Sequence, residues 1–205
     1  MLKKIFTSAV IMASLIFVVN SYAAITGSAH DFSSAGWNST GEICIVCHTP
    51  HNADQTVTDA PLWNHQVTTA TFTVYSGAGT LDATVGQPDG VSKLCLSCHD
   101  GTVALDSFGG TTTGTNYVTG NSNLGTDLSN DHPISFTYDS ALATADGELV
   151  TPQSTSTVDG TLPLFNGKLE CATCHDVHNT ASAGNPNLLL KDNTGSALCL
   201  SCHSK

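Results

Sequence analysis

The most hydrophobic segment of the chain is its N-terminal run from Ile5 to Val19. The basic pair Lys3-Lys4 precedes this run, and Asn20-Ser21-Tyr22-Ala23 follows it with small residues at the positions that a signal peptidase reads. The run is shorter than the roughly 20 residues that span a bilayer. We therefore predict a cleaved signal peptide over residues 1–23, with an uncleaved membrane anchor as the alternative. Residues 24–205 are then a single exported domain without a membrane span.

Elsewhere the pattern of hydrophobic and polar positions predicts little regular structure. Two short stretches, Thr69–Tyr75 and His132–Tyr138, alternate as β-strands do. The segment from Thr111 to Asn130 is rich in Gly, Thr and Asn and is typical of a surface loop. Aromatic residues make up only 6% of the chain, so side chains alone bury too little apolar surface to offset the ordering entropy. Something other than side chains is expected to supply the core.

Charge narrows the range of partners. The chain has 17 acidic residues against six lysines and no arginine, and its formal net charge is −11. A protein this acidic lacks the cations that neutralise phosphates, so nucleic-acid binding is excluded. Cationic proteins, metal ions and mineral surfaces are better partners, although the acidity also serves simply to keep an exported protein soluble.

All eight cysteines occur in one repeated pattern, C-x-x-C-H, which is the attachment motif of c-type haem. Two cysteine sulfurs bond to the two vinyl groups of one porphyrin, and the next residue directs its imidazole to the iron. A Cys₄ zinc site, a disulfide scaffold or a redox dithiol would use the cysteines but not the invariable histidine. The four pairs are Cys44 and Cys47, Cys95 and Cys98, Cys171 and Cys174, and Cys199 and Cys202.

Four motifs predict four covalent haems, and haems in such number would form the hydrophobic core themselves. The expected fold is therefore mostly irregular coil wrapped around haems, with a short helix at each motif and a few short strands. The proximal iron ligands are the histidines of the motifs, His48, His99, His175 and His203.

The opposite face of each iron is expected to carry a second histidine. The only methionines, Met1 and Met12, lie in the predicted signal peptide, so methionine ligation is excluded. Five histidines remain for four faces, and one is surplus: His30, His51, His65, His132 and His178. Irons closed by two histidines pass electrons but bind small substrates poorly, which indicates an electron carrier and not an enzyme.

The five distal candidates differ in their surroundings. His51 and His178 each lie three residues after a proximal histidine, from where they can reach the iron of a closely stacked neighbouring haem. Asp131 and Pro133 flank His132 and can orient its ring. Trp63, close to His65, can pack on a porphyrin. The sequence leaves open which histidine serves which iron.

His30 lies on a polar arm near the start of the exported chain, where it could ligate a haem in the next copy of the protein. Such a head-to-tail contact does not close on itself and builds a filament.

The order of several motifs matches a known family: S-A-H-D-F, C-I-V-C-H-T-P-H-N, A-P-L-W-N-H, C-L-S-C-H-D-G, D-H-P-I, C-A-T-C-H-D-V-H-N and L-C-L-S-C-H. The chain resembles the secreted multihaem c-type cytochromes of metal-respiring bacteria, and most closely the tetrahaem, filament-forming OmcE type. The resemblance implies an extracellular wire of haems, stacked in alternating parallel and perpendicular pairs. It also implies bis-histidine ligation throughout and one ligand donated across the subunit boundary, for which His30 is the candidate.

The leading hypothesis is therefore extracellular electron transfer through polymerised copies to an acceptor such as metal oxide, with other cytochromes as redox partners. A discrete tetrahaem shuttle in the periplasm or on the outer surface is the alternative. A reductase of nitrogen or sulfur oxyanions would need an open iron and cationic groups, and the absence of arginine counts against it. A zinc-binding structural protein is a further alternative.

Overall fold

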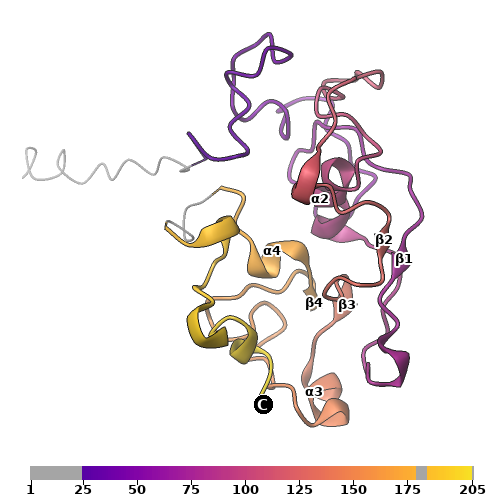
Figure 1. The fold of residues 1–205 in the computed structure, drawn as a ribbon, viewed down its shortest axis with the longest axis vertical. Helices are drawn as coiled ribbons and strands as arrows, with labels where there is room; N and C mark the ends of the chain where they lie inside the picture. Colours follow the sequence, from indigo (N-terminus) through magenta and orange to yellow (C-terminus); the bar gives the residue numbers. More distant parts are fainter. Residues whose placement is uncertain (1–24, 179–183, 205) are drawn as a thin grey trace, which may run out of the picture.

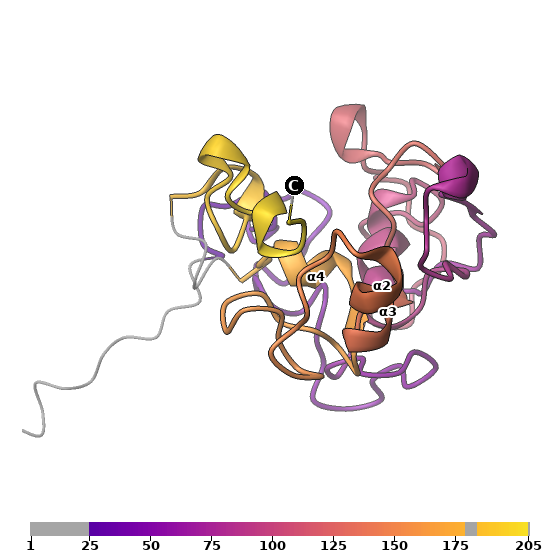
Figure 2. The same cartoon turned by 90° about the horizontal axis from the view of Figure 1, so that it is seen from below.

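The computed structural model describes residues 25–178 and 184–204. The predicted signal peptide, residues 1–23, lies outside these residues. Within them no helix is both long and apolar enough to span a bilayer. Most of the described chain is turn, bend or coil, as predicted from the sequence, and long irregular segments connect the few short elements (Figures 1 and 2).

The helices are short. They are α2 (Gly90–His99), α3 (Ser140–Asp146) and α4 (Cys171–Cys174), with 3-10 turns η1 (Gly77–Gly79), η2 (Gly120–Ser122), η3 (Pro186–Leu188), η4 (Thr194–Ser196) and η5 (Cys199–Ser201). The second and third haem motifs lie on α2 and α4 as predicted, and the fourth lies on η5. The first motif is no helix in this structure; it forms only a hydrogen-bonded turn.

The strands occur in two separate pairs of two residues each. Strand β1 (Thr73–Val74) pairs in parallel with β2 (Asp127–Leu128), and β3 (Phe136–Thr137) pairs antiparallel with β4 (Lys168–Leu169). Both predicted alternating stretches thus contain a strand, although each strand covers only two of the seven residues. The predicted surface loop over residues 111–130 is mostly exposed and contributes η2 and β2.

Helix α3 was not predicted, yet it has clear end signals. The Asp139 carboxylate accepts a hydrogen bond from Leu142 N at 2.8 Å and caps the first turn. Gly147 ends the helix with a φ of +75°, which glycine adopts without strain.

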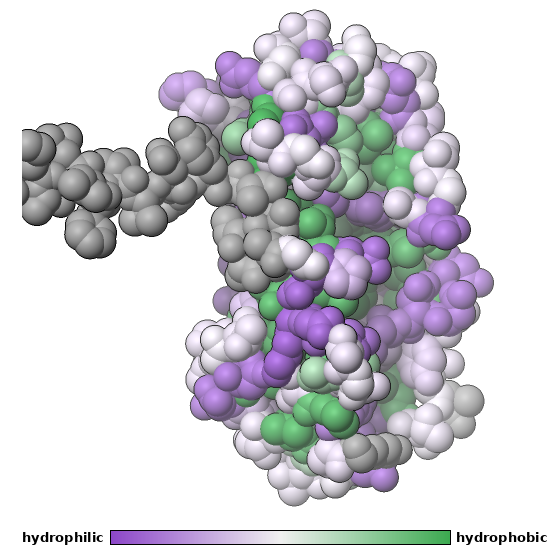
Figure 3. Space-filling model, turned by 60° about the vertical axis from the view of Figure 1, so that its left-hand side comes forward, coloured by the Kyte–Doolittle hydropathy of each residue, from purple (hydrophilic) through white to green (hydrophobic). Residues whose placement is uncertain are grey.

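The buried side chains form three small clusters and not one core. The largest contains Phe136, Tyr138 and Leu169 beside Val158, Leu162 and Leu164. Two others centre on Trp63 and on Leu96. The space-filling view shows hydrophobic side chains in recesses between raised polar ones (Figure 3). The polypeptide alone therefore leaves hydrophobic surface exposed, and an apolar cofactor can cover it.

Candidate haem-binding sites

Each C-x-x-C-H motif is folded into one helical turn. In the first, third and fourth motifs the histidine N–H donates to the carbonyl of the first cysteine, at 2.8 Å for His48, 3.0 Å for His175 and 2.9 Å for His203. The second motif lies within α2. This turn brings the two sulfurs and the imidazole of a motif to one side of the backbone, as attachment of one porphyrin requires.

Three proximal histidines are held in one tautomer by backbone carbonyls. Nδ1 of His48 lies 2.6 Å from the Pro61 carbonyl oxygen, that of His99 lies 2.7 Å from Ser122 O, and that of His175 lies 2.8 Å from Asn187 O. Because a carbonyl only accepts, Nδ1 must carry the proton and donate. Nε2 is then left with its lone pair, which is the arrangement of a histidine that binds a metal.

Three pairs of imidazoles face one another across the chain. The ring centres of His30 and His99 are 5.9 Å apart, those of His48 and His178 are 6.0 Å apart, and those of His132 and His203 are 6.5 Å apart. A metal–imidazole bond of about 2.0–2.1 Å, with the ring centre about 1.1 Å beyond the nitrogen, places two imidazoles on one metal about 6.3 Å apart. Each pair therefore has the separation that suits one iron between its rings.

His30 reaches its partner from the N-terminal arm, which aromatic contacts hold in place. The ring centres of Phe32 and Trp37 are 5.3 Å apart, and those of Trp37 and Phe108 are 6.3 Å apart. Burial lowers the pKa of His30 to about 4, and repulsion from His99 adds to the effect. The imidazole is thus neutral near pH 7, which is the form that binds a metal. Its Nδ1 is buried without a hydrogen-bond partner among the described residues, and a bound cofactor could satisfy it.

His65 is placed differently from the other distal candidates. Its ring is buried, with Nδ1 2.9 Å from the Gln66 carbonyl oxygen and Nε2 3.0 Å from that of Ala104. Both nitrogens therefore face backbone carbonyls, and both also lie near Cys98 Sγ, at 3.9 Å from Nδ1 and 3.7 Å from Nε2. This geometry favours His65 as the surplus histidine.

His51 and His175 belong to none of the three facing pairs. Both side chains are exposed. Among the described residues, no aromatic ring lies against either of them. The structure thus brings together six of the sequence-predicted ligands in three pairs. His51 and His175 stand outside these pairs, although His175 is near enough to His30 to contribute to the lowered pKa of His30.

The cysteines of successive motifs lie near one another. Burial and then the neighbouring Cys47 thiol raise the pKa of Cys98 to about 12. The Cys95 thiol hydrogen-bonds with that of Cys171, which with burial raises the pKa of Cys95. Burial and then Cys202 raise the pKa of Cys174 to about 11. Each motif therefore lies in space beside the motif that follows it in the sequence.

The surroundings of the cysteines fit neither a disulfide scaffold nor a Cys₄ zinc site. All eight are free thiols, so no disulfide scaffold is formed. Among the described residues, which include every cysteine and histidine, no three His, Cys, Asp or Glu side chains gather as a metal-ion site. A Cys₄ zinc site is thus absent from the described chain.

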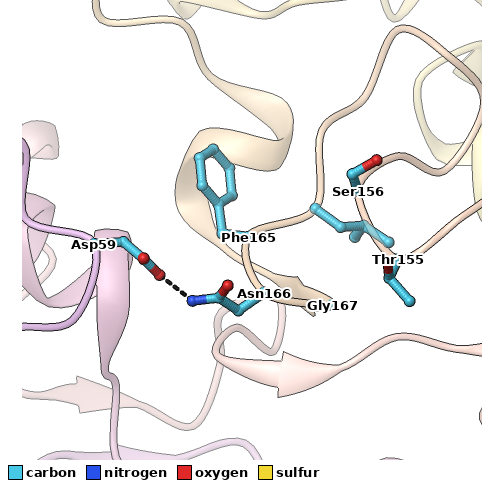
Figure 4. A pocket seen from close by; sticks show the side chains of 7 residues that line it. Asp59, Thr155, Ser156, Phe165, Asn166 and Gly167 are labelled. Atoms are coloured by element: carbon cyan, nitrogen blue, oxygen red, sulfur yellow. Dashed lines mark hydrogen bonds between the residues drawn. The ribbon is translucent and has the colours of Figure 1, made fainter.

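One surface cavity is not part of these sites. It is about 670 Å³ in volume and is lined by Asp59, Thr155, Ser156, Leu164, Phe165, Asn166 and Gly167. Figure 4 shows Asp59 hydrogen-bonded to Asn166 across it. No cysteine or histidine of the motifs lines this cavity, and it offers no reactive constellation.

These features define a c-type cytochrome-like haem-binding region that binds haem c covalently and carries electrons. Comparison with known families supports this class: residues 163–205 match the model of the doubled CXXCH motif family. The matched segment contains the third and fourth motifs. Comparison with curated proteins gives no match.

Sequence reasoning missed the ion pair that anchors the fourth motif. Lys191 Nζ donates to Asp159 Oδ2 at 2.9 Å and to Ser201 Oγ, between the two cysteines, at 2.6 Å. Partial burial alone would raise the pKa of Asp159, but hydrogen bonds from Lys191, Leu162 and Thr161 lower it to about 2. The isolated lysine near the C-terminus was the only signal in the sequence.

This ion pair predicts a loss of stability in acid. Because the folded-state pKa of Asp159 lies below its unfolded value of 3.8, its contribution is complete above pH 4 and is lost as the pH falls towards 2. Asp159→Asn should cost about 1 kcal/mol at pH 7, since both groups are partly exposed. Thermal unfolding at pH 7 and between pH 4 and 2 measures both effects. An unchanged melting temperature at pH 7 would rule out the anchoring role.

Proposed function

We propose that the protein transfers electrons outside the cytoplasm through four covalently bound c-type haems, each iron held by two histidines. The observation that carries this proposal is the set of three facing imidazole pairs, 5.9 to 6.5 Å apart. The same pairs include three of the four motif histidines. A haem iron, when bound, accepts and releases one electron.

The geometry supports a specific set of ligands. Three irons take both ligands from one chain, as the pairs His30/His99, His48/His178 and His132/His203. The fourth iron takes His175 and, by elimination, His51, since both nitrogens of His65 lie within 3.0 Å of backbone carbonyl oxygens. With every face closed, the chain's residues bind and orient the cofactors and exclude other iron ligands. This favours a carrier over a reductase.

The outward-facing pair provides a reason for assembly. His51 and His175 are both exposed, and no ring contact joins them within the described chain, so His51 of one copy is suited to complete the His175 site of the next. A donor site and an acceptor site at different places on each copy make a heterologous contact, which builds filaments when it does not close into a ring. His30, the donor expected from the sequence, lies instead against His99 of its own chain.

The contacts between successive motifs favour an electron path that follows their order in the sequence, continued between copies by the His51 contact. An extracellular or cell-surface filament of this kind would take electrons from other cytochromes and deliver them to an acceptor such as metal oxide. The alternative is a discrete tetrahaem shuttle in the periplasm or on the outer surface, in which His51 and His175 meet within one chain.

Cryo-electron microscopy of the protein from its own secreting cells tests the assembly. We expect filaments in which His51 ligates the His175 iron of the next copy, and we expect His51→Ala to give discrete particles that keep four haems. Gln55→Ala, an exposed substitution on the same loop, should still form filaments.

Discrete wild-type particles with four haems would contradict the filament and leave the shuttle. Particles without covalent haem would contradict the electron-transfer proposal as a whole.

A further inference from the structure

Glu170 is the most deeply buried acidic side chain beside a haem motif. It is 1% exposed and immediately precedes Cys171 on α4. Carboxylates are rarely buried to this extent unless hydrogen bonds compensate for lost hydration. The axial-ligand scheme gives this residue no role, so its position calls for a separate explanation.

Glu170 joins three segments of the chain. Its Oε2 accepts a hydrogen bond from Ser92 N of α2 at 3.3 Å and from Ser135 Oγ, just before β3, at 2.9 Å. Its own N–H donates to Thr173 Oγ1 at 3.0 Å. Ser92 Oγ in turn accepts from Cys171 N at 2.9 Å. The carboxylate thus lies at the joint between α2 and α4, the two helices that carry the second and third motifs.

The same joint brings two haem-attachment cysteines together. The thiols of Cys95 and Cys171 hydrogen-bond to each other, and both interact electrostatically with the Glu170 carboxylate. If these thiols are bonded to porphyrins, the attachment points of two haems would lie next to this carboxylate. A negative charge there favours the ferric over the ferrous state and lowers the reduction potential of both.

The other charged groups facing the joint do not cancel this effect. Asp89, at the start of α2, adds a second negative charge, and Lys168 of β4 pairs with Asp89 at 2.5 Å. Both belong to a partly exposed ion pair. Cys95 and Cys171 no longer titrate once they are thioethers. Glu170 is therefore the titratable group that is both buried and adjacent to two haem edges.

We propose that Glu170 couples proton uptake to electron uptake at the second and third haems, and this inference rests on the proposed function. When an iron of the pair gains one electron, the Glu170 carboxylate gains one proton from solvent and becomes a neutral carboxylic acid. On oxidation the electron and the proton both leave. The Ser135 hydroxyl lies 2.9 Å from Oε2 and 3.4 Å from the backbone carbonyl oxygen of Asp89, an exposed residue, and so links the buried carboxylate to the surface.

Burial is consistent with this behaviour, because desolvation raises the pKa of Glu170 above its usual value while Ser92 and Ser135 oppose the rise. The carboxylate can then change its protonation state in response to a nearby change in charge.

The test is a redox titration of the haem-loaded protein at a series of pH values, for wild type and Glu170→Gln. We expect two of the wild-type reduction potentials to fall as the pH rises, by up to about 59 mV per pH unit. This value corresponds to a tenfold change in the equilibrium constant of a one-electron reaction. In Glu170→Gln these two potentials should be higher at neutral pH and nearly independent of pH. Glu42→Gln, which removes an exposed carboxylate, should behave as wild type.

A second variant keeps the carboxylate and removes one of its donors. Ser135→Ala should raise the pKa of Glu170 and move the pH-dependent window upward, which a purely structural role would not do. Infrared difference spectra should show a carboxylic acid band that appears on reduction and is missing in Glu170→Gln.

Haem content is measured first, so the two proposals fail separately. Protein without covalent haem would overturn the proposed function. Four haems with potentials that depend on pH equally in wild type and Glu170→Gln would overturn only the role of Glu170 and assign the proton to another group, such as a haem propionate.

Discussion

Cys95→Ala/Cys98→Ala should remove one haem and prevent most of the protein from folding. Helix α2, which carries these cysteines, also contributes Leu94 and Leu96 to two of the three buried clusters. Removing a haem next to them leaves a larger cavity than the truncation of one large buried side chain does. Such a truncation alone already costs about 2–5 kcal/mol of stability. That loss is comparable to the total stability of a typical domain. Haem-to-protein ratio, intact mass and the yield of soluble protein measure the result.

Cys199→Ala/Cys202→Ala is the matched control for this substitution. Cys199 is exposed and η5 lies at the C-terminal end of the described chain. This variant should also lose one haem but should keep the other three and remain folded. If either variant retained the wild-type haem ratio, covalent attachment at those cysteines would be refuted.

His178→Ala should convert one iron from low spin to high spin. The ring centres of His178 and His48 are 6.0 Å apart, so under the proposed ligand set the removal of His178 would open one face of the iron assigned to His48. Electron paramagnetic resonance should show a new high-spin signal from one iron per chain, and the reduced variant should bind carbon monoxide. Added imidazole should restore the low-spin signal, because it replaces the missing ring without repairing the backbone.

His65→Ala is the control for ligand loss. Its two ring nitrogens lie within 3.0 Å of backbone carbonyl oxygens, to one of which the neutral ring donates. We therefore expect no high-spin signal and instead a loss of about 1–3 kcal/mol of stability from the lost buried hydrogen bond. A high-spin signal in His65→Ala, with none in His178→Ala, would contradict the assignment of ligands.

The haem motifs and the irregular fold could be predicted from sequence because both are local properties. The spacing C-x-x-C-H fixes one helical turn, and a chain poor in aromatics predicts sparse regular structure. Helix α3 could have been predicted from Asp139 and Gly147, which mark its ends. The first motif forms only a hydrogen-bonded turn, which the C-x-x-C-H spacing does not distinguish from the short helices of the other motifs.

The pairing of histidines could not be predicted, because it depends on contacts between distant segments. Nothing near His178 in the sequence indicates that it faces His48, or that His132 faces His203. The role of Glu170 was hidden for the same reason, since Ser92 and Ser135 come from separate segments. The position of His30 on the arm and the family resemblance predict a ligand for a neighbouring copy, and that prediction stays untested; within one chain its ring lies 5.9 Å from that of His99.

The most direct test of the central claim is the spin state of the irons in the assembled wild-type protein, recorded by electron paramagnetic resonance on a sample of known haem content. We expect four covalent haems per chain, all low spin with two axial histidines, and no binding of carbon monoxide on reduction. Fewer than four haems, or an iron that is high spin and binds carbon monoxide, would contradict it.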